Sequence, residues 1–424
     1  MTNPELDKLK DHQVDHLFLL IGENPLPNYV AAHLLLNKGG TPYLVHTTGT
    51  FDQAKRLKEI LKNDLFGCKS AELISLGEYE SDGYHIQDEI CQIAGKLALS
   101  DRVGLHYTGG TKAMAVHAYR AMLSLKHSNV VFSYLDPRRL EMCIDREDQD
   151  RIHENVAIDV KPRLERVFQL HGKVCEKTPI QEVKLPEFAK KLATLHGDGQ
   201  KSKAWFKWFY DEICCENLRK KKGNGEWGDW RSKQILEKLE ISISNLPQEA
   251  IDGFIEQGFI SSEGLLSFAK VHETQKFAKL EHFCEWLGGL WLEYQVLQVI
   301  KDISGDRLIH DYGMDFKVPT GSGKNFQFDV AFMRGYQLFA ISCTTSAKDD
   351  LCKLKLFEAR TRALQLGGSE ARVALVCCSN NPESLKIELR GTTEDSKIEV
   401  FGRDDLPKLT EKFNSWIAEQ EKKS

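Results

Sequence analysis

The stretch His106-Tyr107-Thr108-Gly109-Gly110-Thr111-Lys112-Ala113-Met114 decides the fold of the first part of this 424-residue chain. An apolar run through Val103 and Leu105 precedes it. An alanine-rich pattern of helical spacing follows it, at Ala113, Val116, Ala118, Ala121 and Leu125. The stretch therefore predicts a strand, a tight glycine turn and the start of a helix.

Two interpretations of this turn stay open on the residues alone. In the first, the glycines let the backbone approach an anion, the free N–H groups of the helix N-terminus point at it, and Lys112 adds positive charge. In the second, the turn only joins a strand to a helix that Thr108 or Thr111 caps. The spacing matches neither the Walker A pattern nor the Rossmann fingerprint.

The residues around this stretch predict an α/β fold. Apolar strands are expected at 16–21, 41–46, 72–76, 103–107 and 130–135, and helices near 31–35, 51–61 and 86–99. This alternation predicts a parallel sheet with helices on both faces. Ligands of such sheets lie beyond the carboxyl ends of the strands. The polar turns at 22–28, 47–49 and 108–112 are all expected at that edge.

Composition limits the class of protein. The formal net charge of −5 argues against a chain that coats nucleic acid non-specifically, although a local basic groove is compatible with it. The eleven cysteines form no CxxC…CxxC pattern, so the sequence predicts no structural zinc site. The N-terminus lacks the shape of a signal peptide, and no apolar run has membrane-spanning length. We expect a soluble cytoplasmic protein that does not bind membranes.

The middle of the chain, from about 162 to 279, has a mainly helical pattern. It contains an aromatic run at 204–210 and a basic, glycine-containing loop at 220–225. Packing in a core is the expected use of the aromatic run. The segment from Pro247 to Phe268 is consistent with a small helical or winged-helix insert.

A third block begins near Leu280. It predicts one long helix over 281–303, a strand over 308–318 and a hairpin of strands 325–333 and 337–343. A helix over 348–366 follows and ends at Gly367-Gly368, a usual stop signal. A strand over 371–378 and a final helix over 409–419 complete the block.

The hairpin carries one acid, Asp329, that suits a metal-dependent phosphodiesterase. Such sites need two or three carboxylates around Mg²⁺ or Mn²⁺ and a lysine beside the attacking water. Restriction-enzyme-like cores supply a Glu-x-Lys on the next strand, where this chain has Ser342-Cys343-Thr344. Glu293 on the preceding helix is a candidate ligand. On the following helix Glu358, Lys353 and Lys355 either replace the missing groups or form an exposed face.

With these residues in view, the chain resembles the CRISPR accessory nucleases that join a CARF domain to a PD-(D/E)xK nuclease domain. The resemblance rests on Gly22–Asn28 and Thr108–Met114 in the first domain. In the third block it rests on Trp291-Leu292-Glu293, Phe328-Asp329-Val330, Met333-Arg334-Gly335 and Gly367-Gly368. It implies a Rossmann-like CARF domain at 1–155, a helical linker or winged-helix insert at 156–279, and a restriction-endonuclease-like domain at 280–424.

The resemblance also implies what the protein binds. Two CARF domains of a homodimer would share one cyclic oligoadenylate, most often cyclic tetra-adenylate, the messenger of type III CRISPR antiviral defence. Family members then cut DNA or RNA with Mn²⁺ or Mg²⁺. The candidate metal ligands are Asp329 and Glu293, which are also candidate catalytic residues, and Lys355 is the candidate catalytic lysine. The implied ligand-binding residues are Gly22, Asn24, Pro25, Thr47, Thr48, Thr108, Gly109, Gly110, Thr111, Lys112 and Met114.

The loss of Glu-x-Lys leads us to expect a messenger-sensing protein whose nuclease-like domain is inactive or weakened. Three alternatives stay open. The first is an active endonuclease whose catalytic groups have moved to neighbouring elements. The second is a ring nuclease that cleaves the messenger in the CARF pocket, with Thr111 and Lys112 stabilising the developing charge. The third is a nucleotide-binding regulator unrelated to CRISPR.

Overall fold

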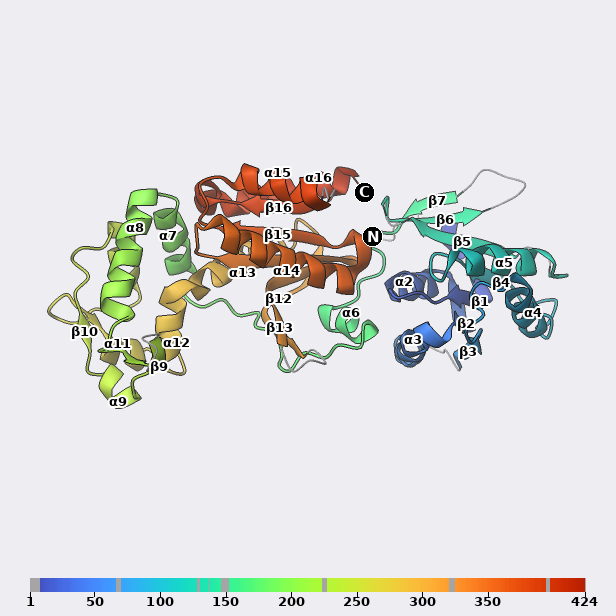
Figure 1. Cartoon of the computed structure of the whole chain (residues 1–424), viewed down its shortest axis with the longest axis horizontal. Helices are drawn as coiled ribbons and strands as arrows, with labels where there is room; N and C mark the ends of the chain where they lie inside the picture. Colours follow the sequence, from blue (N-terminus) through green and yellow to red (C-terminus); the bar gives the residue numbers. More distant parts are fainter. Residues whose placement is uncertain are drawn as a thin grey trace.

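The computed structural model describes residues 8–65, 70–127, 130–136, 138–145, 152–222, 227–319, 325–393 and 397–423. Figure 1 shows three parts in a row, and their order in space differs from their order in the sequence. The N-terminal α/β part lies at one end and most of the helical middle at the other. The C-terminal part, drawn in orange and red, lies between them.

The N-terminal part is built on a seven-stranded sheet of order β3-β2-β1-β4-β5-β6-β7. Its first five strands are parallel. They are β1 (Val14–Leu20), β2 (Leu36–His46), β3 (Glu72–Ser75), β4 (Val103–His106) and β5 (Val131–Asp136). The predicted parallel sheet is therefore confirmed.

Helices cover both faces of this sheet, as predicted. They are α2 (Leu26–Leu35), α3 (Phe51–Asp64), α4 (Gly83–Ala94) and α5 (Lys112–Leu123), with a short 3-10 turn at Thr48–Thr50. Leu17 and Leu19 of β1 share one core with α2 and α3. Phe18 and Leu20, which alternate with them, share the opposite core with α4 and α5. A strand buried on both faces has the uninterrupted apolar sequence of β1 for this reason.

Two details of the N-terminal part differ from the sequence prediction. Strands β6 (Glu141–Asp145) and β7 (Ile152–Asn155) extend the sheet in antiparallel fashion and were not predicted. Their alternating polar residues are typical of an edge with one exposed face. Helix α4 starts earlier than predicted, because the Asp82 side chain accepts hydrogen bonds from the Tyr84 and His85 N–H groups.

The middle region is mainly helical, as predicted, with two small ribbons. Its helices are α6 (Leu164–Leu170), α7 (Pro186–His196), α8 (Gly199–Trp208), α9 (Lys233–Leu236), α10 (Gln248–Glu256), α11 (Phe268–Glu273) and α12 (Leu280–Glu285), and a π-turn follows α8 at Phe209–Ile213. The ribbons pair β8 (Arg219–Lys221) with β9 (Trp227–Trp230), and β10 (Glu240–Ile241) with β11 (Leu266–Ser267). Part of the basic loop at 220–225 lies outside the described residues.

The C-terminal part contains a mixed sheet of order β12-β13-β14-β15-β16. The predicted strands, the hairpin and the helix after it are confirmed, while α15 and β16 were missed. The strands are β12 (Ile309–Pro319), β13 (Asn325–Arg334), β14 (Gln337–Thr344), β15 (Arg372–Cys377) and β16 (Ile398–Phe401). The helices are α13 (Trp291–Ile303), α14 (Asp349–Gly367), α15 (Pro382–Thr393) and α16 (Leu409–Lys423), with 3-10 turns at Gly368–Glu370 and Arg403–Lys408.

The single long helix predicted over 281–303 is wrong. The segment divides into α12, a π-turn at Trp286–Leu290, and α13. Gly289 has a φ of 157°, outside the helical range. A Cβ at the neighbouring Gly288 would lie 2.9 Å from the ring of Phe209, so the break brings the chain close to the middle region.

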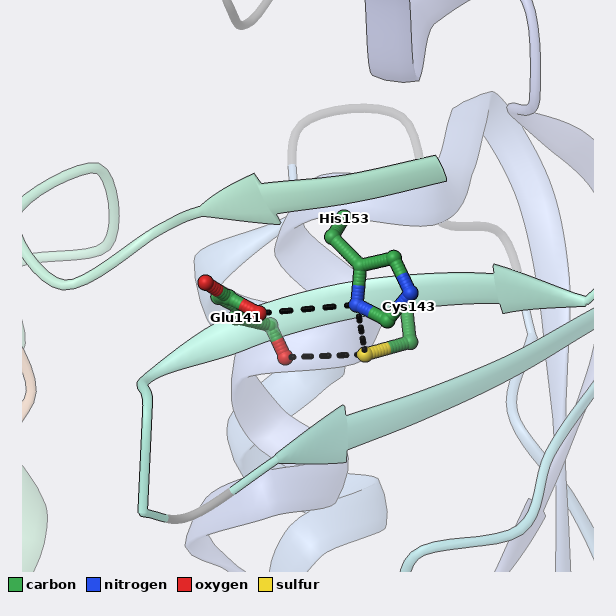
Figure 2. Close-up of side chains that lie close together, drawn as sticks. All are labelled: Glu141, Cys143 and His153. Atoms are coloured by element: carbon green, nitrogen blue, oxygen red, sulfur yellow. Dashed lines mark hydrogen bonds and ion pairs between the residues drawn. The ribbon is translucent and has the colours of Figure 1, made fainter. Parts of the chain in front are cut away.

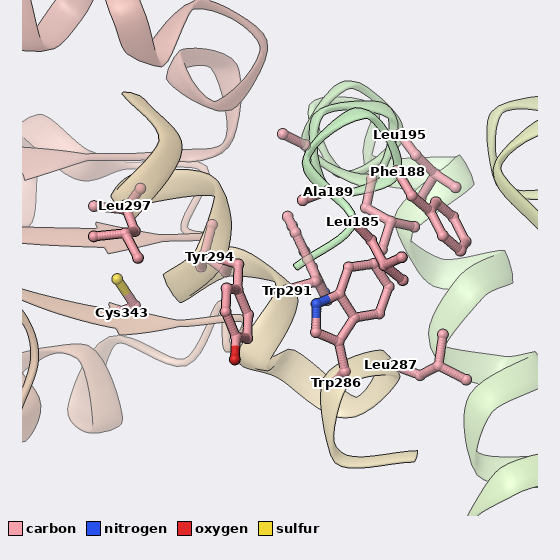
Figure 3. Close-up of a cluster of buried hydrophobic side chains, with 14 of the residues drawn as sticks. Leu185, Phe188, Ala189, Leu195, Trp286, Leu287, Trp291, Tyr294, Leu297 and Cys343 are labelled. Atoms are coloured by element: carbon pink, nitrogen blue, oxygen red, sulfur yellow. The ribbon is translucent and has the colours of Figure 1, made fainter. Parts of the chain in front are cut away.

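The middle and C-terminal parts share one hydrophobic core. Trp286 and Trp291 are fully buried, and their rings pack against Phe188 and His196 of α7. Figure 3 shows Phe188 and Leu195 of the middle region on one side of these rings and Tyr294, Leu297 and Cys343 on the other. The aromatic residues Trp205 and Trp208 are buried in the same core, as predicted. The domain boundary predicted at residue 279 therefore separates residues that share one hydrophobic core.

No helix in the described ranges has both the length and the apolar composition that a membrane span requires.

Candidate functional site

The three polar turns predicted to form a ligand site lie at one edge of the N-terminal sheet. They follow β1, β2 and β4, which are neighbours in the order β2-β1-β4. The chain order reverses between β1 and β4, which is the position in such sheets where ligands bind, beyond the carboxyl ends of the strands. The structure thus brings together the predicted residues of 22–25, 47–48 and 108–112.

The glycines of two of these turns are in backbone contact. A Cβ at Gly109 would lie 2.1 Å from the carbonyl oxygen of Leu20, and one at Gly22 would lie 3.1 Å from the Gly110 nitrogen. Gly110 also has a φ of 74°, in the region that favours glycine. The two turns therefore meet through their backbones at this site.

Two asparagine side chains hold the turn after β1 in place. Asn28 is fully buried and its Nδ2 donates to the Leu20 carbonyl over 2.9 Å, which fixes the end of β1. The Asn24 Oδ1 accepts from the Leu26 N–H over 3.0 Å. Sequence reasoning did not single out Asn28, although an amide on the apolar face of a helix is a signal for a buried hydrogen bond.

The capping interpretation is correct for Thr111 and wrong for Thr108. Thr111 Oγ1 accepts from the Met114 N–H over 3.1 Å and donates to the Glu80 carbonyl over 3.1 Å. Thr108 Oγ1 instead accepts from the Leu135 N–H over 2.7 Å, which ties the turn to β5. Lys112 is exposed at the first position of α5. An N-cap and an anion cradle are compatible, since both use the same helix end.

The remaining predicted ligand residues differ in exposure. Thr48 is exposed, whereas Thr47 is nearly buried and its N–H donates to Thr50 Oγ1 over 3.0 Å. Pro25 precedes α2 and is buried. Met114 is fully buried, with its sulfur 3.5 Å from the Thr111 nitrogen. Met114 therefore supports the turn from beneath.

A second candidate centre lies in the C-terminal sheet around Asp329. Asp329 on β13 faces Ser342 on the neighbouring strand β14, as predicted from the hairpin. Its Oδ2 accepts from Ser342 Oγ over 2.9 Å and from the Cys343 N–H over 2.7 Å. Lys355 reaches the same oxygen from α14, with its Nζ 3.5 Å away. Lys355, from the helix after the hairpin, therefore lies beside Asp329, whose neighbouring strand lacks the Glu-x-Lys motif.

Glu293 on α13 is the other acid of this centre. Its Oε2 is buried and has no hydrogen-bond partner among the described residues. Burial, then the charge of Asp329, raises the pKa of Glu293, while Lys355 opposes that rise. Burial lowers the pKa of Lys355, but Asp329, Cys343 and Glu293 together raise it above its ordinary value. Because its pKa is raised to about 8, Glu293 holds a proton at neutral pH unless a cation takes the place of that proton.

A cavity of about 220 Å³ opens beside Asp329 and Lys355. It is lined by Phe328, Asp329, Ile341, Ser342, Lys355, Glu358 and Ala359. Of the candidates on α14, Lys355 and Glu358 line the cavity. Lys353 instead forms an ion pair with Glu388 over 2.7 Å. Thr344, at the position of the family lysine, accepts from the Ser346 N–H over 3.2 Å.

The donors of this centre fit a hard divalent cation. Mg²⁺ and Mn²⁺ bind through carboxylate oxygens and keep several water ligands. Asp329 and Glu293 supply two carboxylates, and the unpartnered Oε2 of Glu293 is a buried acceptor that a cation would satisfy. The cavity leaves room for water and a phosphate group.

Comparison with known proteins supports the fold. No model of a known protein family matches the chain, and no curated protein matches its sequence. The crystal structure of protein VC1899 from Vibrio cholerae matches at a TM-score of 0.72 and 18% identity, over 96% of this chain and 98% of that one. Can2 from Sulfobacillus thermosulfidooxidans, solved in complex with cyclic tetra-adenylate, matches at 0.65 and 15% identity, over 95% and 99%.

A third structure, a type III CRISPR defence DNA nuclease activated by cyclic oligoadenylate, matches at a TM-score of 0.49 and 16% identity. It covers 86% of this chain and 45% of that one. The likeness to VC1899 and Can2 extends over nearly the full length of both. The chain therefore has the α/β, helical and mixed-sheet architecture of Can2, which confirms the fold expected from the resemblance to CARF nucleases.

Proposed function

We propose that this protein is a type III CRISPR ancillary effector that binds a cyclic oligoadenylate and, in response, cuts nucleic acid with Mn²⁺ or Mg²⁺. One observation carries the nuclease half of the proposal: Lys355 Nζ lies 3.5 Å from Asp329 Oδ2, beside the buried Glu293. Glu293 and Lys355 would together replace the acid and the lysine of the missing Glu-x-Lys, beside Asp329. This arrangement favours an active site with moved groups over an inactive domain.

Each group has a distinct role in this proposal. Asp329 and Glu293 hold the cation, which supplies a more acidic water and neutralises charge on the phosphate when bound. Ser342 Oγ and the Cys343 N–H fix the carboxylate of Asp329. Lys355 keeps its proton, because the two acids raise its pKa, and it orients the attacking water or stabilises the phosphate. Glu358 lines the same cavity and adds a further carboxyl group to its wall.

The ligand half of the proposal rests on the three turns. Their backbone N–H groups, the start of α5 and Lys112 form a site for phosphates. Can2, which has the same fold, is solved with cyclic tetra-adenylate, so this ring is the first ligand to test. A ring with two-fold symmetry suits a site shared by two copies of the chain, so the proposal includes a homodimer.

The decisive experiment follows three substrates at once. Purified protein is mixed with Mn²⁺, labelled DNA and labelled RNA, with and without cyclic tetra-adenylate, and the ring itself is followed as well. We expect ring-dependent cutting of DNA or RNA that Lys355→Met abolishes. Lys353→Met is the matched control, because it lies on the same helix but pairs with Glu388.

The same assay separates the alternatives. Ring binding without cutting of any nucleic acid would support a messenger sensor with an inactive domain, the outcome that the loss of Glu-x-Lys predicts. Loss of the ring without added metal would support a ring nuclease. In the structure the Thr111 hydroxyl already makes two hydrogen bonds, so Lys112 would be the main charged group for that reaction. Tighter binding of mononucleotides than of rings would favour an unrelated regulator.

A further inference from the structure

Three side chains with metal-binding atoms converge on strands β6 and β7, away from both sites described above. Cys143 and His153 are directly paired across the two strands. Glu141 lies two residues before Cys143, so its side chain points to the same face of the sheet. Figure 2 shows the carboxylate, the thiol and the imidazole turned toward one another.

One nitrogen is at the centre of this cluster. His153 Nδ1 lies 3.2 Å from Cys143 Sγ and 3.5 Å from Glu141 Oε2. The three ligand atoms lie within 4.8 Å of one another. The thiol also points at the Glu141 carbonyl, 3.9 Å away.

This geometry does not suit a nucleophilic cysteine. A cysteine–histidine–carboxylate relay needs the thiol at one ring nitrogen and the carboxylate at the other. Here both groups face Nδ1, which cannot accept a proton from the thiol and donate one to the carboxylate at the same time. Burial and the carboxylates of Glu141, Asp136 and Asp145 raise the pKa of Cys143 to about 11, so the isolated thiol is not activated.

We propose that Glu141, Cys143 and His153 form a Zn²⁺ site with three protein ligands and a water in the fourth position. Zinc is bound by cysteine sulfur at about 2.3 Å and by histidine nitrogen or carboxylate oxygen at about 2.0–2.2 Å. In a tetrahedron these lengths separate sulfur from nitrogen by about 3.5 Å, and nitrogen from oxygen by about 3.3 Å. The separations in the structure are 3.2 and 3.5 Å, so small rotations admit the ion.

The surroundings also favour a cation. The Asp136 and Asp145 carboxylates act on the sulfur in addition to Glu141, and Arg139 opposes them. The His153 side chain is 41% exposed and that of Glu141 24%, so an ion has access from solvent. The site would join the two antiparallel edge strands and does not depend on the proposed messenger or nuclease activity.

The sequence prediction of no structural zinc site rested on the absence of CxxC pairs. The ligands here are ten residues apart, from Cys143 to His153, and are brought together only by strand pairing. Their spacing alone therefore gave no zinc signature.

The test is a zinc titration of the full chain against a chromophoric chelator, in excess Mg²⁺. We expect one tightly bound Zn²⁺ per chain in the wild type. Loss of a residue that only supports a metal ligand typically weakens metal binding 10–100-fold. Loss of a ligand itself, in Cys143→Ser or His153→Ala, should therefore weaken zinc binding about 100-fold or more. Cys91→Ser is the control, since this partly buried cysteine in the same domain lies outside the cluster.

Cobalt gives an independent readout. Co²⁺ at the proposed site should show a sulfur-to-metal charge-transfer band that Cys143→Ser removes and Cys343→Ser or Asp329→Ala retains. Circular dichroism of each variant distinguishes ligand loss from misfolding. Failure of the folded wild type to bind zinc, or binding that survives Cys143→Ser, would overturn the proposal, whatever the outcome for messenger binding.

Discussion

Asn24 of the first proposed ligand turn lies directly against Gly368, the residue that follows the end of helix α14. A Cβ at Gly368 would lie 2.2 Å from Asn24 Nδ2, and Gly368 has a φ of 66°. The same helix carries Lys355, which reaches Asp329. A helix is a rigid element, so a ligand that moves Asn24 would act on the helix that completes the candidate nuclease centre.

This contact predicts that Gly368→Ala impairs both stability and response. The new methyl group meets Asn24 and the backbone is strained, at a combined cost of about 1–3 kcal/mol. We expect a lower melting temperature and weaker binding of cyclic tetra-adenylate by calorimetry. Gly264→Ala is the matched control, because Gly264 has a φ of 81° but no atom within 4 Å of its added Cβ. Equal effects of the two variants on ring binding would mean that Asn24 is not involved.

Lys112→Ala should weaken binding of the ring by about 1.5–3 kcal/mol, the scale of a hydrogen bond to a charged group. The reason is that Lys112 is exposed at the start of α5, next to the glycine turn. Calorimetry measures the effect. Lys126→Ala, an exposed lysine beyond the other end of α5, should bind the ring like the wild type. Unchanged affinity in Lys112→Ala would remove this residue from the ligand site.

Asp329→Asn and Lys355→Met should each reduce ring-dependent cutting by at least about 100-fold, since groups of this kind act in the same step. Product formation in a single-turnover assay with Mn²⁺ measures the loss. Asp329→Asn keeps the shape of the side chain and its acceptor for Ser342 Oγ, so folding is preserved. Full cutting by Asp329→Asn would place the chemistry elsewhere.

Glu293 predicts a pH dependence of stability in the absence of divalent cations. Its folded pKa is raised from 4.5 to about 8, so the protonated form stabilises the fold. That stability is fully present below pH 4.5 and is lost as the pH rises toward 8. The side chain of Glu293→Gln stays neutral at every pH. Its free energy of unfolding should therefore exceed that of the wild type by at least about 1 kcal/mol at pH 8, and the two should be equally stable at pH 4.

The control for this experiment is the exposed Glu285, whose substitution by Gln should leave the pH profile unchanged. Added Mn²⁺ should raise the melting temperature of the wild type at pH 8 and act less on Glu293→Gln, because a bound cation replaces the proton. Parallel profiles of wild type and Glu293→Gln between pH 5 and 8 would contradict the raised pKa of Glu293, and an equal effect of Mn²⁺ on both proteins would contradict its assignment to the metal.

The sequence by itself determined the elements and the main motifs. The apolar runs of β1 to β5, the glycine turn before α5 and the hairpin of β13 and β14 are local patterns, in which neighbouring residues specify strand, turn or helix. The stop of α14 at Gly367-Gly368 is local in the same way. Asp329 and Ser342 were placed on adjacent strands because a short hairpin fixes its own register.

Only the tertiary structure decided which distant residues meet. Lys353 and Lys355 are equivalent by sequence, and the packing of α14 alone turns Lys355 toward Asp329 and Lys353 toward Glu388. Contacts between remote segments also decide three other features. These are the helix break at Gly289, the approach of Asn24 to Gly368 and the pairing of Cys143 with His153. Local propensity carries no information on such contacts, because they form only when separate elements bury their apolar faces together.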